Sequence, residues 1–288
     1  MDFKTQSEVW IKQISTRKRH PVRGSTLERY NSILRLYLLP KIGTLDLSQV
    51  GNKTVKELVA NLHLSAASVQ QAVVILKMVV KSAVDEEGNQ TYPRTWNSTM
   101  IDAPSIEDQD APIISLDTLQ AAIGSSYGEC KGLYALLAGS GLRVSEALSL
   151  TCGQDDQKSN FWDVSESLLH VRHSKTDAGV RLVDLDPELN AFLVSTIQPS
   201  QGLVFNPNID TQRARLASLI GNGKFHSFRR FRVTHLDKSN TPSSLVRFWI
   251  GHSAGDISQR YMKVGNDIQA RKEWAKKVGI GFEFSKLF

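Results

Sequence analysis

The chain contains only two cysteines, Cys130 and Cys152, and neither belongs to a C-x-x-C pair. No histidine is spaced from them as a zinc ligand would be, so neither a disulfide framework nor a zinc site is expected. The simplest interpretation is a reducing compartment in which both thiols are buried as small apolar side chains.

Long apolar runs are also missing. No segment approaches the roughly 18 apolar residues that a membrane-spanning helix requires, and the N-terminus lacks the apolar region of a secretory signal. The chain has neither a cluster of metal ligands nor a glycine-rich nucleotide-binding motif. The sequence therefore predicts a soluble, cytoplasmic protein that needs no cofactor and no metal and has no membrane partner.

Length and charge narrow the choice of partner. The 288 residues are enough for two domains, and 41% apolar with 22% charged residues is ordinary for a globular protein. The formal net charge of +6 favours a polyanionic partner. In residues 1–30, seven lysines and arginines face three acidic residues. Charge alone fits equally well a basic protein without such a partner.

The first part of the chain has a helical pattern. Pro21 and Gly24 break it once, Pro40 and Gly43 break it again, and Ser65 is a suitable helix cap. The apolar spacing predicts helices over residues 3–19, 27–39, 53–62 and 65–84. A small all-helical domain is expected. Its basic residues, taken alone, are more typical of a solvated surface than of a binding surface.

A polar stretch divides the chain. Residues 88–112 contain recurrent prolines and acidic side chains and no apolar period, which predicts a linker. The helical domain would then cover residues 1–87 and a second domain with a C-terminal tail residues 113–288. A flexible linker would allow the two domains to close around a duplex as a clamp.

The second domain contains a predicted β-hairpin. Two apolar segments, 168–172 and 180–184, flank a polar turn at 174–179. Lys175 is therefore expected at the tip of the hairpin.

Short motifs in this domain place polar residues beside turns. They supply two arginines, two histidines and a tyrosine, which suit chemistry on a phosphodiester because fixed cations and N–H donors stabilise a developing anion. His226 and Arg229 are one helical turn apart and share a face. In chain order the motifs are G-L-R-V-S-E with Arg143 and Glu146, H-S-F-R with His226 and Arg229, G-H with His252, and R-Y with Tyr261.

These motifs resemble, in order and spacing, those of the tyrosine recombinase (phage integrase) family. That family has G-L-R-x-x-E, a hairpin lysine, H-x-x-R, and G-H followed nine positions later by a tyrosine, the interval between His252 and Tyr261 here. The resemblance covers roughly residues 112–265 firmly and the N-terminal part in outline. Arg230 stands where many members have histidine. The implied fold is mainly α with a small β-hairpin or sheet, in an all-helical core-binding domain and a catalytic domain.

The resemblance also implies roles for the strongest residues. Tyr261 would be the nucleophile that attacks a DNA phosphorus, and Arg143 and Arg229 would bind the two non-bridging oxygens. From the residues alone, Arg229 can also be an ordinary surface ion-pair partner, and any tyrosine can be a packing residue.

Four further residues receive supporting or proton-transfer roles by resemblance. Lys175 would protonate the departing 5′-oxygen, although it also fits a solvated turn. His226 would take the tyrosine proton or donate to the phosphate, and His252 would donate to a non-bridging oxygen. Glu146 would orient an arginine or histidine, or form a helix-surface salt bridge.

The function implied is site-specific DNA recombination through a covalent 3′-phosphotyrosine intermediate. The partner would be double-stranded DNA with paired recombination sites, bound by a homo-tetramer of a nucleoid-associated protein. No long segment precedes the first helix, which favours a simple recombinase acting on short sites.

The alternatives are a non-catalytic DNA-binding protein on the same fold and a DNA-relaxing enzyme like the type IB topoisomerases. A helix-turn-helix regulator would explain the charge but not the ordered motifs.

The C-terminal tail has two interpretations. Phe282, Phe284, Leu287 and Phe288 form an apolar end after an interruption at 278–281. The end can fold back on its own domain. By resemblance, it can instead dock on a neighbouring protomer and couple active sites in a tetramer.

Overall fold

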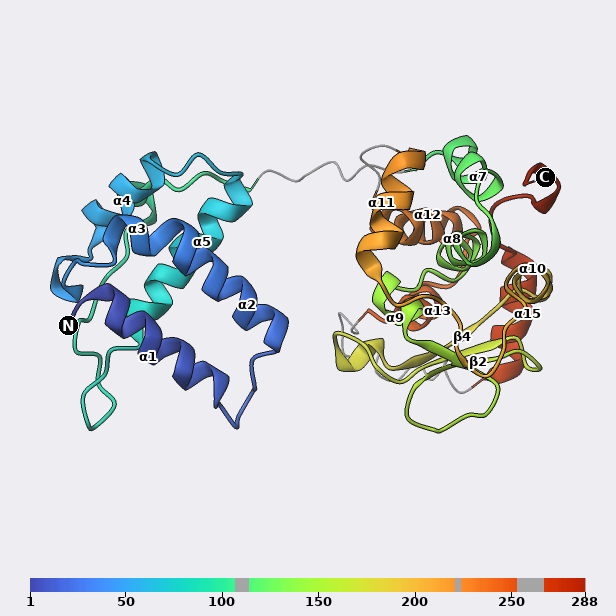
Figure 1. Cartoon of the computed structure of the whole chain (residues 1–288), viewed down its shortest axis with the longest axis horizontal. Helices are drawn as coiled ribbons and strands as arrows, with labels where there is room; N and C mark the ends of the chain where they lie inside the picture. Colours follow the sequence, from blue (N-terminus) through green and yellow to red (C-terminus); the bar gives the residue numbers. More distant parts are fainter. Residues whose placement is uncertain (107–113, 221–223, 253–266, 288) are drawn as a thin grey trace. The chain divides into compact units, whose positions relative to one another are not determined.

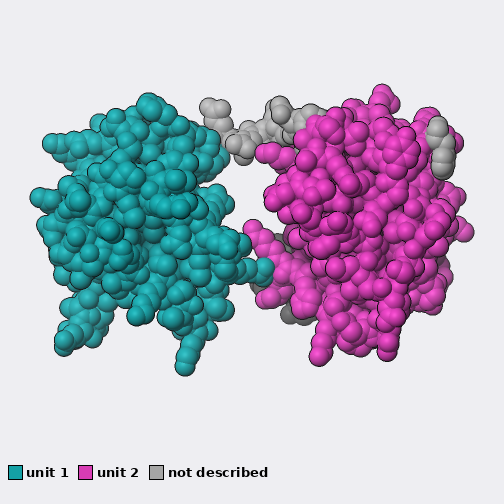
Figure 2. Space-filling view, in the orientation of Figure 1, with its two compact units in different colours: residues 1–110 teal, residues 111–288 magenta. Residues whose placement is uncertain are grey.

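A computed structural model describes residues 1–106, 114–220, 224–252 and 267–287 of the chain. The chain forms two compact units, Met1–Asp110 and Ala111–Phe288 (Figure 1, Figure 2). Among the described residues, no helix combines the length and apolarity needed to cross a bilayer.

Unit 1 is helical around one apolar core. Ser65 caps its longest helix by accepting a hydrogen bond from the amide of Ser68, as the sequence predicts. The rings of Trp10 and Tyr30 stack at 5.4 Å and join the first two helices. The helices are α1 (Phe3–Ser15), α2 (Gly24–Ile33), α3 (Leu39–Ile42), α4 (Asn52–Ala60), α5 (Ala66–Lys81) and α6 (Ser98–Ile101), with short turns η1 (Leu34–Leu38) and η2 (Leu47–Gln49).

The predicted end of the second helix at Pro40 is wrong, because the helical path continues to Ile42. The segment η1 is a π-helix in which the amide of Leu39 donates to the carbonyl of Leu34, five residues back. This wider turn precedes Pro40, which has no N–H to donate and lies in the first turn of α3, where proline is tolerated.

The linker predicted for residues 88–112 starts too early in the sequence, because residues after 88 still pack in unit 1. Arg94 donates hydrogen bonds to the carbonyls of Leu47, Ser48 and Val50, and Ile101 is buried in the core of unit 1. An arginine that satisfies three loop carbonyls and a buried isoleucine give this segment its own contacts, although its composition is that of a linker. Residues 107–112 of the expected linker lie outside the described residues.

Unit 2 surrounds the buried helix α8 (Gly128–Ser140) with helices and a small sheet, which confirms the predicted fold class (Figure 1). Its other helices are α7 (Leu116–Gly124), α9 (Val144–Leu148), α10 (Pro187–Ile197), α11 (Ile209–Ile220), α12 (His226–Lys238), α13 (Ser243–Ile250) and α15 (Ile268–Val278), with 3₁₀ turns η3 (Asp177–Gly179) and η5 (Phe284–Lys286). Its strands are β1 (Leu150–Cys152), β2 (Asn160–Asp163), β3 (Leu168–Val171), β4 (Arg181–Asp184) and β5 (Gly202–Leu203).

The sheet has the order β4-β3-β2-β1-β5. Strands β3 and β4 are antiparallel, with Leu168 opposite Asp184 and Val171 opposite Arg181, which confirms the predicted hairpin. Strands β1 and β2 pair in parallel and were not expected from the sequence. The turn with Lys175 lies at one end of the hairpin, and β4 lies against α13 and α15.

The tail folds back on its own unit, the first of its two interpretations. Phe282 and Leu287 are buried in the unit 2 core. The ring of Phe284 stacks on Phe192 at 4.7 Å. Lys131 Nζ donates to the carbonyl of Leu287 at 2.9 Å. Docking on a neighbouring protomer stays a prediction, and Phe288 lies outside the described residues.

Candidate active site

The first motif places Arg143 at a sharp change of direction. Helix α8 ends at Gly141, whose φ of 71° favours glycine. A Cβ at this position would lie 2.6 Å from Ile250 Cδ1 and 3.2 Å from Arg232 Cγ, so any other residue would also have to displace these two side chains. Arg143 follows as the N-cap residue immediately before α9, and its side chain is only partly buried.

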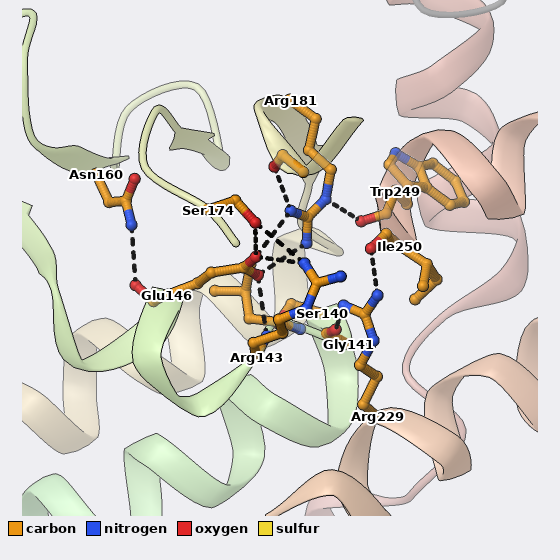
Figure 3. Close-up of polar contacts among 12 residues, drawn as sticks. Ser140, Gly141, Arg143, Glu146, Asn160, Ser174, Arg181, Arg229, Trp249 and Ile250 are labelled. Carbon is orange, nitrogen blue, oxygen red and sulfur yellow. Dashed lines mark hydrogen bonds and ion pairs between the residues drawn. The ribbon is translucent and has the colours of Figure 1, made fainter. Parts of the chain in front are cut away.

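Glu146 is the centre of the polar network in Figure 3. Its Oε1 accepts from Arg143 Nη1 at 2.7 Å and from Ser174 Oγ at 2.6 Å, and its Oε2 accepts from the Arg143 amide at 3.0 Å and from Arg181 Nη2 at 3.1 Å. Burial raises the pKa of this carboxyl, but the hydrogen bonds and the charge of Arg181 outweigh it and lower the pKa to about 2. The carboxylate is therefore charged and joins α9, the hairpin turn and β4.

Arg181 belongs to the site although sequence reasoning did not select it. Its side chain is 1% exposed. Besides Glu146, it donates through Nε to the carbonyl of Trp249 and through Nη1 to the carbonyl of Gly179, each at 2.6 Å. An arginine next to the apolar Leu182 and Val183 of a predicted strand was the available signal, because a buried charge requires partners.

Arg229 lies in the interior beside this network. It projects from α12, is 3% exposed, and donates to the carbonyls of Gly141 at 2.8 Å and of Ile250. Burial, followed by the charges of Arg143 and Arg181, lowers its pKa to about 10. Its guanidinium therefore holds the end of α8 to the end of α13 and stays charged at neutral pH.

The two motif histidines are exposed and share charged neighbours with the arginines. His226 is the first residue of α12, and His252 follows the end of α13 at Gly251. Burial lowers both pKa values below the usual 6.5, and the positive charges of Arg229 and Arg143 lower them further. Both imidazoles are therefore mainly neutral at pH 7, and each can donate one proton and accept another.

The hairpin turn is fastened to α9 by Asn160. Its Oδ1 accepts from the amides of Arg172 and His173 at 2.7 and 2.8 Å, and its Nδ2 donates to Ser149 Oγ at 2.7 Å. Ser174, the next residue, donates to Glu146 and accepts from Arg143 Nη1 at 3.1 Å. The exposed Lys175 is thereby carried beside Arg143.

The structure thus brings together Arg143, Glu146, His226, Arg229 and His252, with Lys175 on the adjoining turn. Tyr261 and the short helix expected to carry it lie outside the described residues. In the described part of unit 2, two exposed histidines and the partly exposed Arg143 lie within electrostatic reach of the buried Arg229. This arrangement offers several N–H donors and fixed positive charge to an anion of phosphate size. No group of three or more metal-ligating side chains is found in the described ranges.

Comparison by sequence finds no matching family model and no matching curated protein. Comparison by structure finds integrases. The Tn1549 transposon integrase in complex with transposon right end DNA has a TM-score of 0.65 at 17% identity, covering 88% of this chain and 92% of that one. A lambda integrase dimer bound to a COC′ core site gives 0.64 at 14% identity, covering 91% and 95%. A lambda integrase tetramer bound to a Holliday junction gives 0.63 at 14% identity, covering 88% and 78%.

These likenesses extend through both units. At such low identity they establish fold rather than activity. The chain therefore has the fold of the tyrosine recombinases, the family that its motifs resemble.

Proposed function

We propose that the protein is a site-specific DNA recombinase that cuts and rejoins duplex DNA through a covalent 3′-phosphotyrosine intermediate. The observation that carries this proposal is that Arg229 joins the other motifs, because it donates to the carbonyls of Gly141, two residues before Arg143, and of Ile250, two residues before His252. The charge of Arg143 accordingly lowers the pKa values of His226, Arg229 and His252. Four groups from three segments that are far apart in sequence thus lie within electrostatic reach of one another. Their combined charge and N–H donors suit the additional negative charge of a phosphodiester transition state.

In the proposed cleavage step, the phenol oxygen of Tyr261 forms a bond to the phosphorus, and the bond from phosphorus to the 5′-oxygen breaks. The phenol proton passes to a neutral imidazole, for which we assign His226, and Lys175 protonates the departing 5′-oxygen. Arg143 and Arg229 bind the non-bridging oxygens, and His252 donates a further hydrogen bond. Rejoining reverses these steps with a different 5′-hydroxyl, so neither a nucleotide nor a metal is consumed.

The division of labour between the units follows from their charges and folds. Unit 1 is proposed as the core-binding domain, with the exposed Arg17, Lys18 and Arg19 between α1 and α2 facing DNA phosphates. Unit 2 is proposed as the catalytic domain. The fold shared with a lambda integrase tetramer on a Holliday junction supports a tetramer on paired sites as the working assembly.

Covalent trapping tests this function. Nicked duplexes from the DNA that flanks the gene are incubated with the protein and run on a denaturing gel, because a nick near the cleavage point releases the 5′-end and prevents rejoining. The expected result is a protein–DNA adduct that disappears in Tyr261→Phe. It should persist in Tyr127→Phe, a matched control that removes the hydroxyl of an 85% exposed tyrosine elsewhere in unit 2.

The alternatives give different outcomes. Specific binding of one duplex by both the unchanged protein and Tyr261→Phe, without an adduct, would contradict strand cleavage and favour a DNA-binding protein. Relaxation of supercoiled DNA without exchange between paired sites would favour a topoisomerase-like activity.

A further inference from the structure

A second buried carboxylate in unit 2 lies outside the motif network. Asp184, the last residue of β4, is 5% exposed. Its Oδ2 accepts from Trp249 Nε1 and from Arg271 Nε, both at 2.8 Å, and its Oδ1 accepts from Arg271 Nη2 at 3.3 Å. Both partners are buried as well, with 2% of Trp249 and 1% of Arg271 exposed.

The two partners come from different helices. Trp249 is in α13, three residues before His252, and Arg271 is in the first turns of α15. Both helices lie against β4 (Figure 1). One carboxylate is thus bonded to the element that precedes residues 253–266 and to the element that follows them. Tyr261 belongs to that intervening stretch of sequence.

Further contacts hold α13 and α15, the two helices that flank residues 253–266. Arg181, at the other end of β4, donates to the carbonyl of Trp249 at 2.6 Å, so this residue is fixed through both its main chain and its indole ring. The guanidinium of Arg271 lies 5.2 Å from the ring centre of Phe248, the neighbour of Trp249. The flanks are therefore joined to each other as well as to β4.

We propose that Asp184 is a positioning residue for strand cleavage: by binding Trp249 and Arg271 together, it fixes the two ends of the segment that carries Tyr261. This inference rests on the proposed function of Tyr261. Fixing both ends of a chain segment reduces the volume that its middle can sample. If the ends of its segment are held in this way, Tyr261 should spend more time in a geometry from which it can attack a phosphate bound by Arg143 and Arg229.

The choice of side chain supports a positioning role. An apolar residue in place of Asp184 would remove the acceptor that its carboxylate gives to the buried Trp249 indole N–H and to Arg271 Nε. A buried ion pair stabilises a fold little better than apolar packing would, but it tolerates few alternative arrangements, which suits a contact that sets position.

The test combines a measurement on the free protein with one on DNA. Asp184→Asn keeps the size of the side chain and removes its charge. Hydrogen exchange of the free protein should become about tenfold faster for the amides of α13 and the first turns of α15, and stay unchanged in α8. Equal acceleration throughout unit 2, or no change in α13 and α15, would overturn the inference that Asp184 holds these two helices together.

The DNA measurement is single-turnover cleavage of the trapped duplex at saturating protein. Asp184→Asn should cleave about tenfold more slowly or worse, with its affinity for the duplex unchanged within about twofold. Faster exchange at the flanks with an unchanged cleavage rate would overturn the positioning role. An absence of any adduct from the unchanged protein would contradict the proposed function instead. The exchange measurement would still decide whether Asp184 holds α13 and α15 together.

Two further variants separate position from stability. Trp249→Phe keeps an aromatic ring and removes only the indole donor, so the change in exchange should be confined to α13 and accompany a smaller loss of rate. Glu166→Gln breaks the exposed ion pair to Lys272, which also joins α15 to the sheet. It should leave both exchange and cleavage unchanged, and a loss of rate equal to that of Asp184→Asn would overturn the proposal.

Discussion

Glu146 is the residue on which the contacts of the candidate site converge. It sits between one partly exposed arginine and one buried arginine, and all of its acceptor capacity is used by Arg143, Ser174 and Arg181. The sequence left open whether this carboxylate was a surface salt bridge. Its 2% exposure decides against that interpretation.

Removing this charge should destabilise unit 2 markedly. Glu146→Gln leaves the buried Arg181 without its counter-charge, which should lower the free energy of unfolding by about 3–5 kcal/mol at pH 7, measured by urea denaturation. Because the folded pKa is lowered from 4.5 to about 2, the stability contributed by the carboxylate is complete above pH 4.5 and is lost as the pH falls towards 2. The difference in the free energy of unfolding between the variant and the unchanged protein should therefore become smaller as the pH falls over that range.

A matched control for this experiment is Glu166→Gln, which breaks an exposed ion pair and should change stability by less than about 1 kcal/mol. Equal effects of the two substitutions would contradict a central role for Glu146.

The two histidines give a test of the cluster that needs no DNA. Burial and nearby arginines lower the pKa of both, and Arg143 is among the causes for each. Arg143→Met should therefore raise the pKa of both His226 and His252, measured by NMR titration of the imidazole signals.

The control is Arg213→Met, which removes an exposed arginine in α11 and should leave both titrations unchanged. A rise at only one histidine in Arg143→Met would show that the two do not share this charge.

Local sequence patterns predict the motif residues of this site. They do not predict the residues that position the motif side chains through hydrogen bonds. Arg143 and Glu146, and His226 and Arg229, are recognisable because they stand in the motifs G-L-R-V-S-E and H-S-F-R, which resemble those of the tyrosine recombinases in order and spacing. Arg181 and Asp184 gain their roles from contacts with segments 35–87 residues away, and Asn160 from contacts 11–14 residues away. No local spacing indicates such contacts. The position of Tyr261 relative to these groups stays a prediction.

At the scale of elements, two tight junctions define the site: the passage from α8 to α9 and the end of α13. At the second, Gly251 has φ of 71°, and a Cβ there would lie 3.0 Å from Arg181 Cδ and from Gly179 Cα. The hairpin, β4 and α13 therefore meet at a point where only a glycine fits.

Gly251→Ala should lower the free energy of unfolding by more than backbone strain alone would. A positive φ costs an alanine about 1–2 kcal/mol, and the crowding against Arg181 should add about 1–3 kcal/mol. Gly128→Ala is the matched control, because Gly128 also has a positive φ, 49°, but no atom within 4 Å of its Cβ position. The measurement is urea denaturation of both variants, and equal losses of stability would contradict close packing at Gly251.

Helices and the hairpin were predictable because their signals are local: apolar spacing, the cap at Ser65, and a polar turn between two apolar segments. Strands β1 and β2 were not, since they have three and four residues and pair in parallel across a loop. The continuation of the helix through Pro40 was missed because the π-turn depends on the packing of Leu34 and Leu38 in the core of unit 1.

At the scale of the whole molecule, the two units have separate cores, and their proposed tasks differ. Unit 2 holds the cluster of Arg143, His226, Arg229 and His252, for which phosphate binding is proposed, whereas unit 1 has exposed basic side chains between α1 and α2. Phosphate contacts of this kind add affinity without reading sequence, and they are sensitive to salt.

Salt dependence should report the role of unit 1. Replacing Arg17, Lys18 and Arg19 by glutamine should weaken DNA binding and reduce the slope of log K against log salt by about 0.9 for each phosphate that the variant no longer neutralises, about 2.7 in all. A charge-matched variant with glutamine at the exposed Lys41, Lys53 and Lys56 should change the slope less. Equal slopes for the two variants would contradict the proposed placement of DNA against the α1–α2 connection.

The central claim is that Tyr261 is the residue that becomes joined to DNA, and identification of that linkage tests it most directly. The adduct from the nicked duplex would be digested with nuclease and protease and the modified peptide sequenced by mass spectrometry. The account predicts a nucleotide attached through its 3′-phosphate to Tyr261. Attachment to another of the six tyrosines, or through a 5′-phosphate, would contradict it.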